Sequence, residues 1–220
     1  ITPQDMFAKG FQQVGAGFPV FLDSEGNEHA LARIERKVDV GYNGFVCDFD
    51  PSITIEQDLN RRDLTINSMA VKIEDWKDFC ETKDHKYVID PYDGLKSIDE
   101  GILYHTSDAF AEDPIRVLRT ARFAARYGYI VHPNTLEMMK QVAPELNAVP
   151  TERIWQEIHK GMGELLGYKM FVILDEADVF DVDVMIPYRK FDYRSMVMSD
   201  STSMITRFCY AASGFSDEDY

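Results

Sequence analysis

The sequence contains few cysteines, and their placement predicts neither a disulfide framework nor a zinc site. Cys47, Cys80 and Cys209 are odd in number and far apart, and none belongs to a Cys-x-x-Cys pair. The five histidines show no His-x-x-x-His spacing. We therefore expect three free thiols in a reducing compartment, which we take to be the cytoplasm.

Long apolar runs and an excess of basic residues are also missing. No stretch approaches the ~18 consecutive apolar residues of a membrane-spanning helix, and no signal peptide is visible, so we expect no membrane partner. The chain has 23 Lys and Arg against 38 Asp and Glu, a net charge of −15. This balance excludes a generally basic nucleic-acid coat protein but allows a local basic site on an acidic body.

The composition suits a folded protein, because apolar residues make up 45% and aromatics 12% of the chain. At ~150 residues per domain, its 220 residues predict one large domain or two small ones. The first residue is Ile1 rather than Met, so we expect something to precede this chain in the gene product.

Helix and strand signals are mixed over residues 1–100, which predicts an α+β fold, and become helical from about Ser107. Over the first 50 residues we predict a helix that begins at Thr2 and is ended by Gly15 to Gly17, strands at 18–22 and 30–34, and a mobile loop at 35–50. The next region is predicted to contain a helix or turn at 55–59, a buried strand or helix at 66–73, and a short strand at 87–89. Helices are predicted at 114–127, 133–142, 152–162 and 168–178, followed by a weakly structured tail from Ser199.

Four arginines fall on one face of the helix predicted at residues 114–127. At ~100° per residue they lie within about 120° of one another, opposite an apolar face. Guanidinium groups side by side repel one another unless anions lie between them, so two interpretations stay open: carboxylates from elsewhere pair with them, or the face binds phosphate. These residues are Arg116, Arg119, Arg122 and Arg126.

Two carboxylates, Glu112 and Asp113, stand just before this helix. Helix capping alone would explain one of them. A carboxylate together with Arg116 would also present an acceptor beside a planar donor fork, which can read the edge of a base.

A dense polar cluster at residues 60–67 precedes an apolar segment. Arg61 and Arg62 are adjacent and cannot both face a core, so we expect one of them to point at an anion or a carboxylate. Asp63 could orient an arginine or accept a ribose hydroxyl. The alternative is a charged turn without function.

Four segments, in order, resemble the motifs of the class II tRNA nucleotidyltransferase and bacterial poly(A) polymerase family. Residues 61–70 (RRDLTINSMA) resemble its Arg-Arg-Asp motif, and 90–94 (DPYDG) resemble the next. Residues 112–126 are similar to its nucleotide-template helix, and 152–157 to its last head-and-neck motif. Residues 2–37 further resemble CCA-adding enzymes of enteric bacteria. The resemblance covers about residues 1–165.

The resemblance implies an α+β nucleotidyltransferase head, with N-terminal strands missing from this chain, followed by a helical neck. We expect a partial head at 1–105, a neck with the template motif at 106–167, and a divergent helical or weakly ordered tail at 168–220. The implied activity is template-independent addition of CCA, or of its terminal A, to the 3′ end of tRNA from CTP and ATP, with Mg²⁺ as cofactor. The alternatives are a poly(A) polymerase and a non-catalytic remnant that binds nucleotide or RNA.

The resemblance also implies roles for the residues that match its motifs. The ribose and triphosphate would be held by Arg61, Arg62, Asp63 and Asn67. The amino-acid template for CTP or ATP would be formed by Glu112, Asp113 and Arg116. The phosphates or the template would be supported by Arg119, Arg122 and Arg126, and the template helix would be buttressed by Glu152, Arg153 and Glu157.

The metal ligands of the family have no match in this chain. The Gly-rich turn and the metal-binding Asp-x-Asp pair of the family are expected upstream of Ile1 or on another chain. Asp48-Phe49-Asp50 has the right letters but lies where the family has a flexible loop needed for the switch to A addition. Glu28 falls where relatives carry a carboxylate beside the metal site, which makes it the candidate catalytic residue. The acidic run at 175–183 would repel a tRNA backbone.

Overall fold

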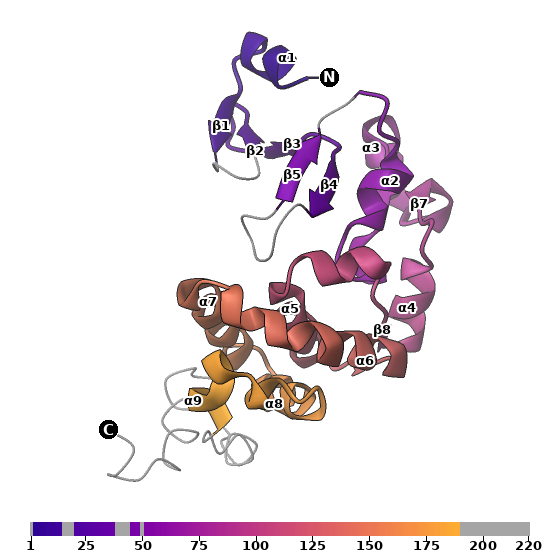
Figure 1. Ribbon diagram of the computed structural model, residues 1–220. Helices are drawn as coiled ribbons and strands as arrows, with labels where there is room; N and C mark the ends of the chain where they lie inside the picture. The colour runs from indigo at the N-terminus through magenta and orange to yellow at the C-terminus, as the bar shows by residue number, and fades with distance from the viewer. Residues whose placement is uncertain (1, 15–19, 38–44, 49–50, 190–220) are drawn as a thin grey trace.

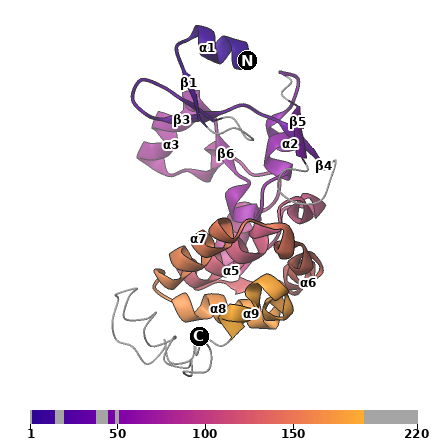
Figure 2. The same cartoon turned by 60° about the vertical axis from the view of Figure 1, so that its left-hand side comes forward.

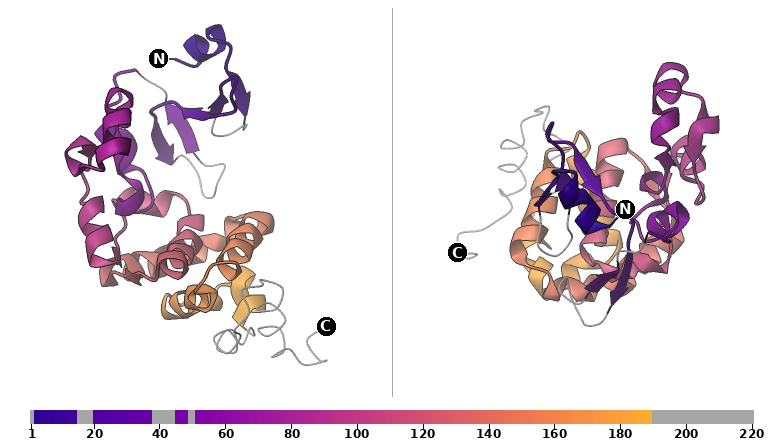
Figure 3. Two further views of the ribbon diagram at one scale, coloured as in Figure 1. Left: turned by 180° about the vertical axis from the view of Figure 1, so that it is seen from behind. Right: turned by 90° about the horizontal axis from the view of Figure 1, so that it is seen from above.

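The computed structural model describes residues 2–14, 20–37, 45–48 and 51–189, with the backbone alone at 34–37, 45–48 and 189. In Figure 1 the chain curves like a reversed C that opens to the left: the N-terminal strands form one arm, the C-terminal helices form the other, and residues 55–105 connect them. The view from behind in Figure 3 shows the same arrangement. The fold is α+β, as the sequence predicts.

The N-terminal helix is shorter than predicted. Helix α1 (Pro3–Ala8) begins with a capping box, in which the Thr2 hydroxyl accepts from the Asp5 N–H and the Asp5 carboxylate accepts from the Thr2 N–H. It ends at Lys9 because Gly10 takes a positive φ of 84°, a conformation that terminates helices. The prediction that Gly15 to Gly17 end it was therefore wrong.

A three-stranded antiparallel sheet follows, in the order β1 (Gln12–Val14), β2 (Val20–Leu22) and β3 (Glu28–Ala30). Phe21 is fully buried, and it forms a small core with Met6 and Leu31. The strand predicted at 18–22 is confirmed at 20–22, but the one predicted at 30–34 was misplaced, because β3 ends at Ala30 and residues 31–33 are not in a strand.

The loop predicted at 35–50 contains a strand pair instead. Strands β4 (Ile34–Lys37) and β5 (Phe45–Asp48) are antiparallel, with Ile34 opposite Asp48. The pairing is made by backbone groups, which do not require the apolar alternation that the sequence lacks here. Residues 38–44, and 49–50 of the Asp-x-Asp-like stretch, lie outside the described residues.

The connecting region consists of short elements. The continuous buried element predicted at 66–73 is absent from this described stretch: a 3₁₀ turn and a two-residue strand occupy it, and Ile73 is 85% exposed. The elements are α2 (Ile55–Asn60), η1 (Thr65–Asn67), β6 (Ala70–Val71), η2 (Ile73–Asp75), α3 (Trp76–Thr82), η3 (His85–Tyr87), β7 (Val88–Ile89), α4 (Gly94–Glu100) and β8 (Ile102–Leu103). The strand predicted at 87–89 is confirmed, since β7 pairs with β6.

The C-terminal arm contains the main core, and its four predicted helices are confirmed. Helix α5 packs between α7 and α8 with its apolar face buried, and Gly128 ends it with a φ of 73° (Figure 2). The elements are η4 (Asp108–Glu112), α5 (Ile115–Tyr127), β9 (Ile130–Val131), α6 (Pro133–Val142), η5 (Ala143–Ala148), α7 (Thr151–Met162), α8 (Gly167–Glu176), η6 (Val179–Asp181), η7 (Asp183–Met185) and α9 (Ile186–Arg189). The predicted weak tail lies outside the described residues.

Two further predictions are tested only in part. Within the described residues, no helix is both long and apolar enough to cross a membrane. Cys80 is an exposed free thiol, whereas the side chains of Cys47 and Cys209 are not described.

Candidate functional site

A polar cleft of about 660 Å³ lies where the segment after α2 meets the start of α5 and the first turns of α7. Five arginines and three carboxylates line it, so the cleft is cationic within a chain of net charge −15. Nine of the residues singled out from sequence meet here although they are up to 96 positions apart. They are Arg61, Arg62, Asp63, Asn67, Asp113, Arg116, Arg119, Arg153 and Glu157.

Asp63 links the Arg-Arg-Asp segment to α5. Its Oδ2 accepts from Arg119 Nη2 at 2.8 Å and Nε at 2.9 Å, and its Oδ1 accepts from the Asn67 amide at 3.0 Å. Burial opposes ionisation of this carboxyl, but the Arg119 charge and the hydrogen bonds outweigh burial and keep the Asp63 pKa below its usual value. Of the two roles considered for Asp63, the structure shows the orientation of an arginine.

Asp58, which sequence reasoning missed, holds both adjacent arginines. Its Oδ1 accepts from Arg61 Nη2 at 2.7 Å, and its Oδ2 lies 3.4 Å from Arg62 Nη2. The same carboxylate accepts from the backbone N–H of Arg33 at 3.3 Å. Its spacing of three and four residues from the arginines, at the end of a predicted helix, was the available signal. Burial opposes its ionisation, yet the arginines hold the Asp58 pKa low.

Asp113 and Arg116 form the start of α5. Asp113 Oδ1 accepts from the Ile115 N–H at 3.2 Å, a helix-capping contact, while Oδ2 accepts from Arg153 Nη2 at 3.0 Å. Arg116 is buried, and its Nη1 donates to the carbonyl of Ala109. Asp113 therefore both caps α5 and forms an ion pair with Arg153, which fixes its carboxylate against α7.

The four arginines of α5 have different surroundings, although they lie on one side of the helix. Arg116 and Arg119 line the cleft, whereas Arg122 turns into the contact with α7. Its Nε donates to Glu157 Oε2 at 2.7 Å, and both side chains are buried. Burial disfavours the Glu157 carboxylate, but Arg122 outweighs it and lowers the Glu157 pKa. Arg126 is exposed at the end of the helix.

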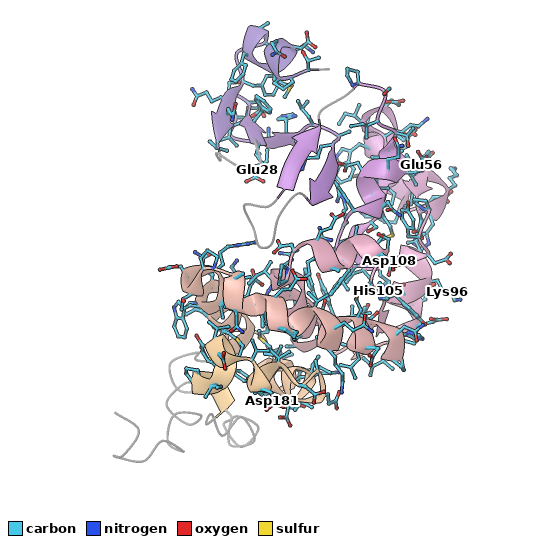
Figure 4. The ribbon with its side chains drawn as sticks, viewed as in Figure 1. Glu28, Glu56, Lys96, His105, Asp108 and Asp181 are labelled. Atoms are coloured by element: carbon cyan, nitrogen blue, oxygen red, sulfur yellow. The ribbon has the colours of Figure 1, made fainter. Side chains whose placement is uncertain are left out.

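Several predicted residues do not reach the cleft. Glu112 lines a separate cavity of about 290 Å³ beside Glu56 and Tyr92. Glu152 is exposed on the first turn of α7. Glu28 is exposed on β3, and Figure 4 shows it on the N-terminal arm, apart from the helices. Among the described residues there is no group of three or more His, Cys, Asp or Glu side chains that could hold a metal ion.

Three cleft residues were not singled out: Ile115, Phe123 and Gln156. Phe123 is an apolar residue on the arginine side of α5, away from the apolar face, and this position was the sequence signal that could have identified it. Its ring lies between two guanidinium groups, with centroid distances of 5.5 Å to Arg119 Cζ and 4.6 Å to Arg122 Cζ.

Two family models match the chain. One, described as "Poly A polymerase head domain", matches residues 13–104, and the other, described as "Probable RNA and SrmB- binding site of polymerase A", matches residues 128–183. The chain belongs to the poly(A) polymerase head-domain family. The resemblance stated from the four motifs is thereby confirmed at the level of the family.

Two relatives of this poly(A) polymerase-family chain share one name. It is 48% identical over 182 residues to the "Multifunctional CCA protein" of Hahella chejuensis, covering 80% of this chain and 40% of that protein. It is 53% identical over 169 residues to the protein of that name from Pseudomonas fluorescens, covering 74% and 39%. The chain thus spans about two fifths of the length of these relatives.

Solved structures share the fold of this family member. A tRNA nucleotidyltransferase complexed with a primer tRNA and an incoming ATP analog has a TM-score of 0.64 at 20% identity, covering 98% of this chain and 64% of that one. A CCA-adding enzyme of Bacillus stearothermophilus in complex with CTP has a TM-score of 0.59 at 20% identity, covering 84% and 45%.

Proposed function

We propose that the protein adds CCA, or its terminal A, to the 3′ end of tRNA by template-independent nucleotidyl transfer from CTP and ATP. The cleft carries this proposal, because it brings the Arg-Arg-Asp segment against the start of α5. The names of the relatives support it. We also propose the division into a partial head at 1–105, a neck at 106–167 and a tail at 168–220, and a cytoplasmic location.

In this proposal the arginines bind the polyphosphate of the incoming nucleotide. Phosphoryl transfer depends mainly on positioning and on cations around the phosphates. Arg61 and Arg62 are held in place by Asp58, and Arg119 by Asp63, so their geometry is set before the nucleotide arrives. Asn67, held by Asp63, lines the same cleft and is assigned to the ribose.

Base selection is assigned to Asp113 and Arg116. A carboxylate accepts from the exocyclic amino group that cytosine and adenine share, and a guanidinium donates to the ring nitrogen beside it. Both residues line the cleft at the start of α5. Glu112 has a supporting role at most, because it faces the smaller cavity. Arg122, Arg153 and Glu157 fix α5 against α7, and Arg153 and Glu157 also line the cleft.

Mg²⁺ is proposed as the cofactor from the family alone. When bound, it would supply charge to the phosphates and to the attacking hydroxyl. The described residues do not fit this ion, since no cluster of potential ligands exists among them and Glu28 is exposed and isolated. Glu28 keeps only its predicted place beside the metal site.

The test uses the full-length protein, a tRNA that lacks CCA, and each nucleoside triphosphate separately and in combination. We expect extension by three nucleotides when CTP and ATP are both present and none with GTP or UTP. Incorporation of ATP alone into any RNA would favour a poly(A) polymerase. Nucleotide binding without transfer would favour the non-catalytic remnant.

A further inference from the structure

Two aromatic rings on α5 lead out of the cleft along the helix. Phe123 lines the cleft, and the ring of Tyr127, one turn further on, lies parallel to it with an interplanar angle of 2° and a centroid distance of 5.9 Å. Tyr127 is 48% exposed. The pair therefore forms a stack whose inner end is in the cleft and whose outer end is open to solvent.

Only the outer ring of the stack lies outside the core: Phe123 is 8% exposed and belongs to the main core, whereas Tyr127 does not. At ~100° per residue, both rings lie within about 20° of Arg116 around the helix axis, on the side that carries the arginines. The buried apolar face, with Val117, Leu118 and Ala121, lies on the other side. Because about half of the Tyr127 surface is in water, its ring is accessible to a ligand.

One cation lies beside the exposed ring and a second lies at the next residue. Arg126 Cζ lies 5.6 Å from the Tyr127 ring centroid, and Lys169 Nζ donates to the carbonyl of the next residue, Gly128, at 2.6 Å. The nearby carboxylate that interacts with Lys169 is Glu176. A tilted third ring, Tyr129, lies 5.6 Å from Tyr127. Aromatic faces flanked by Arg and Lys are typical of surfaces that bind single-stranded nucleic acid.

We propose that Phe123 and Tyr127 form a stacking platform for the unpaired 3′-terminal base of the RNA primer, with Arg126 and Lys169 beside its phosphates. This inference rests on the proposed function. The platform begins in the nucleotide cleft, where the primer 3′-hydroxyl must arrive. It also ends at the residue before the segment 128–183, whose family model is described as a probable RNA-binding site.

A stacking platform suits successive nucleotide addition. During addition of CCA, the terminal base of the primer changes from the base that preceded CCA to C. Every base has an apolar π-face, so stacking tolerates this change, whereas hydrogen bonds to base edges would not. Selection at Asp113 and Arg116 and tolerance at Tyr127 would then act on two different bases, the first inside the cleft and the second on the exposed ring.

The test measures primer stacking without requiring catalysis. The full-length protein is titrated into an acceptor-stem RNA that lacks CCA and carries 2-aminopurine as its unpaired 3′-terminal base. We expect the wild-type protein to quench the fluorescence, Tyr127→Phe to quench it as well, and Tyr127→Leu to lose most of the quenching. Trp76→Leu is the matched control, because Trp76 is 52% exposed on α3 and does not line the cleft, so this replacement should change nothing.

Kinetics add a second readout. Tyr127→Leu should raise the KM for the primer by about tenfold, within the range measured for one stacked base, with the KM for CTP changed less than twofold. Circular dichroism checks that the variant is folded. Unaltered quenching, an unaltered primer KM, or an equal rise in both KM values would overturn the proposal. Quenching that depends on Tyr127 without any nucleotide transfer would uphold the platform and refute the proposed enzyme activity.

Discussion

Asp63 and Arg119 are 56 positions apart in the sequence and form an ion pair of 2.8 Å at the wall of the cleft. One belongs to the segment that follows α2 and the other to α5, so the pair ties the connecting region to the helical arm at the site itself. Asp63 also accepts from Asn67 and from the Leu64 N–H, which fixes its carboxylate in one orientation. The pair is therefore a structural element of the cleft as well as part of its charge.

Replacing Asp63 by Asn should lower stability in a pH-dependent way. The folded carboxyl has a pKa below the unfolded value, so its contribution is complete above about pH 4 and is lost as the pH falls through the folded pKa. We expect the free energy of unfolding of Asp63→Asn to be about 2 kcal/mol below wild type at pH 7, with the gap narrowing towards pH 3. Urea denaturation at both pH values measures this.

The matched control for that experiment is Asp99→Asn, which removes an exposed carboxylate from α4. It should leave the free energy of unfolding within about 0.5 kcal/mol of wild type at pH 7. A gap for Asp63→Asn that stays the same from pH 7 to pH 3 would contradict the role given to the ionised carboxylate.

Asp58→Asn should weaken nucleotide binding without changing nucleotide choice. The amide keeps the shape of the side chain but removes the charge that holds Arg61 and Arg62. We expect the KM values for CTP and ATP to rise together by about tenfold, because charge-assisted hydrogen bonds contribute ~1.5–3 kcal/mol. Steady-state kinetics with both nucleotides measures the effect, and Glu74→Gln, an exposed carboxylate, is the control. A change for only one nucleotide would show that Asp58 acts on the base.

Arg116→Ala should impair base selection more than triphosphate binding. The guanidinium lines the cleft beside Asp113, and its fork provides the donors of the proposed template. Arg116→Lys keeps the charge but not the planar fork, so it should lose selectivity too while it retains the KM for the favoured nucleotide. The ratio of kcat/KM for CTP, ATP, GTP and UTP measures this. Unchanged selectivity in both variants would refute the template role.

The sequence predicted the helices of the C-terminal arm because local signals define them. Pro114 and Gly128 bracket α5, and the alternation of arginines with apolar residues gives its orientation. The partners of those arginines could not be predicted in the same way. Arg122 pairs with Glu157 and Arg119 with Asp63 through tertiary packing, which periodicity does not report.

The strands were harder to predict for a related reason. The β4–β5 pair has no apolar alternation to signal it, since its contacts are backbone hydrogen bonds between short segments. Asp58 was missed because it belongs to no resembled motif, although its spacing from the two arginines predicts ion pairs on a helix. Motif resemblance thus identified the residues that line the cleft better than those that hold them in position.

Gly94→Ala should destabilise the connecting region. Asp90 accepts from the Gly94 N–H at 2.7 Å and the Leu95 N–H at 2.9 Å, which fixes the start of α4, and the hydroxyls of Ser97 on α4 and Thr65 on η1 are 2.8 Å apart. A Cβ at residue 94 would lie 2.5 Å from the Thr65 carbonyl oxygen and 2.8 Å from the Met69 side chain. Because a backbone oxygen cannot rotate away, we expect a loss of about 1–3 kcal/mol in the free energy of unfolding.

The same substitution should also raise the KM for both nucleotides, since Thr65 and the cleft residue Asn67 lie in the same 3₁₀ turn, which the added methyl group would displace. Lys96→Ala, at an exposed position of α4, is the control and should alter neither quantity. A Gly94→Ala protein with wild-type stability would mean that α4 moves away from η1 at no cost. A destabilised protein with unchanged KM values would instead show that the cleft does not depend on this contact.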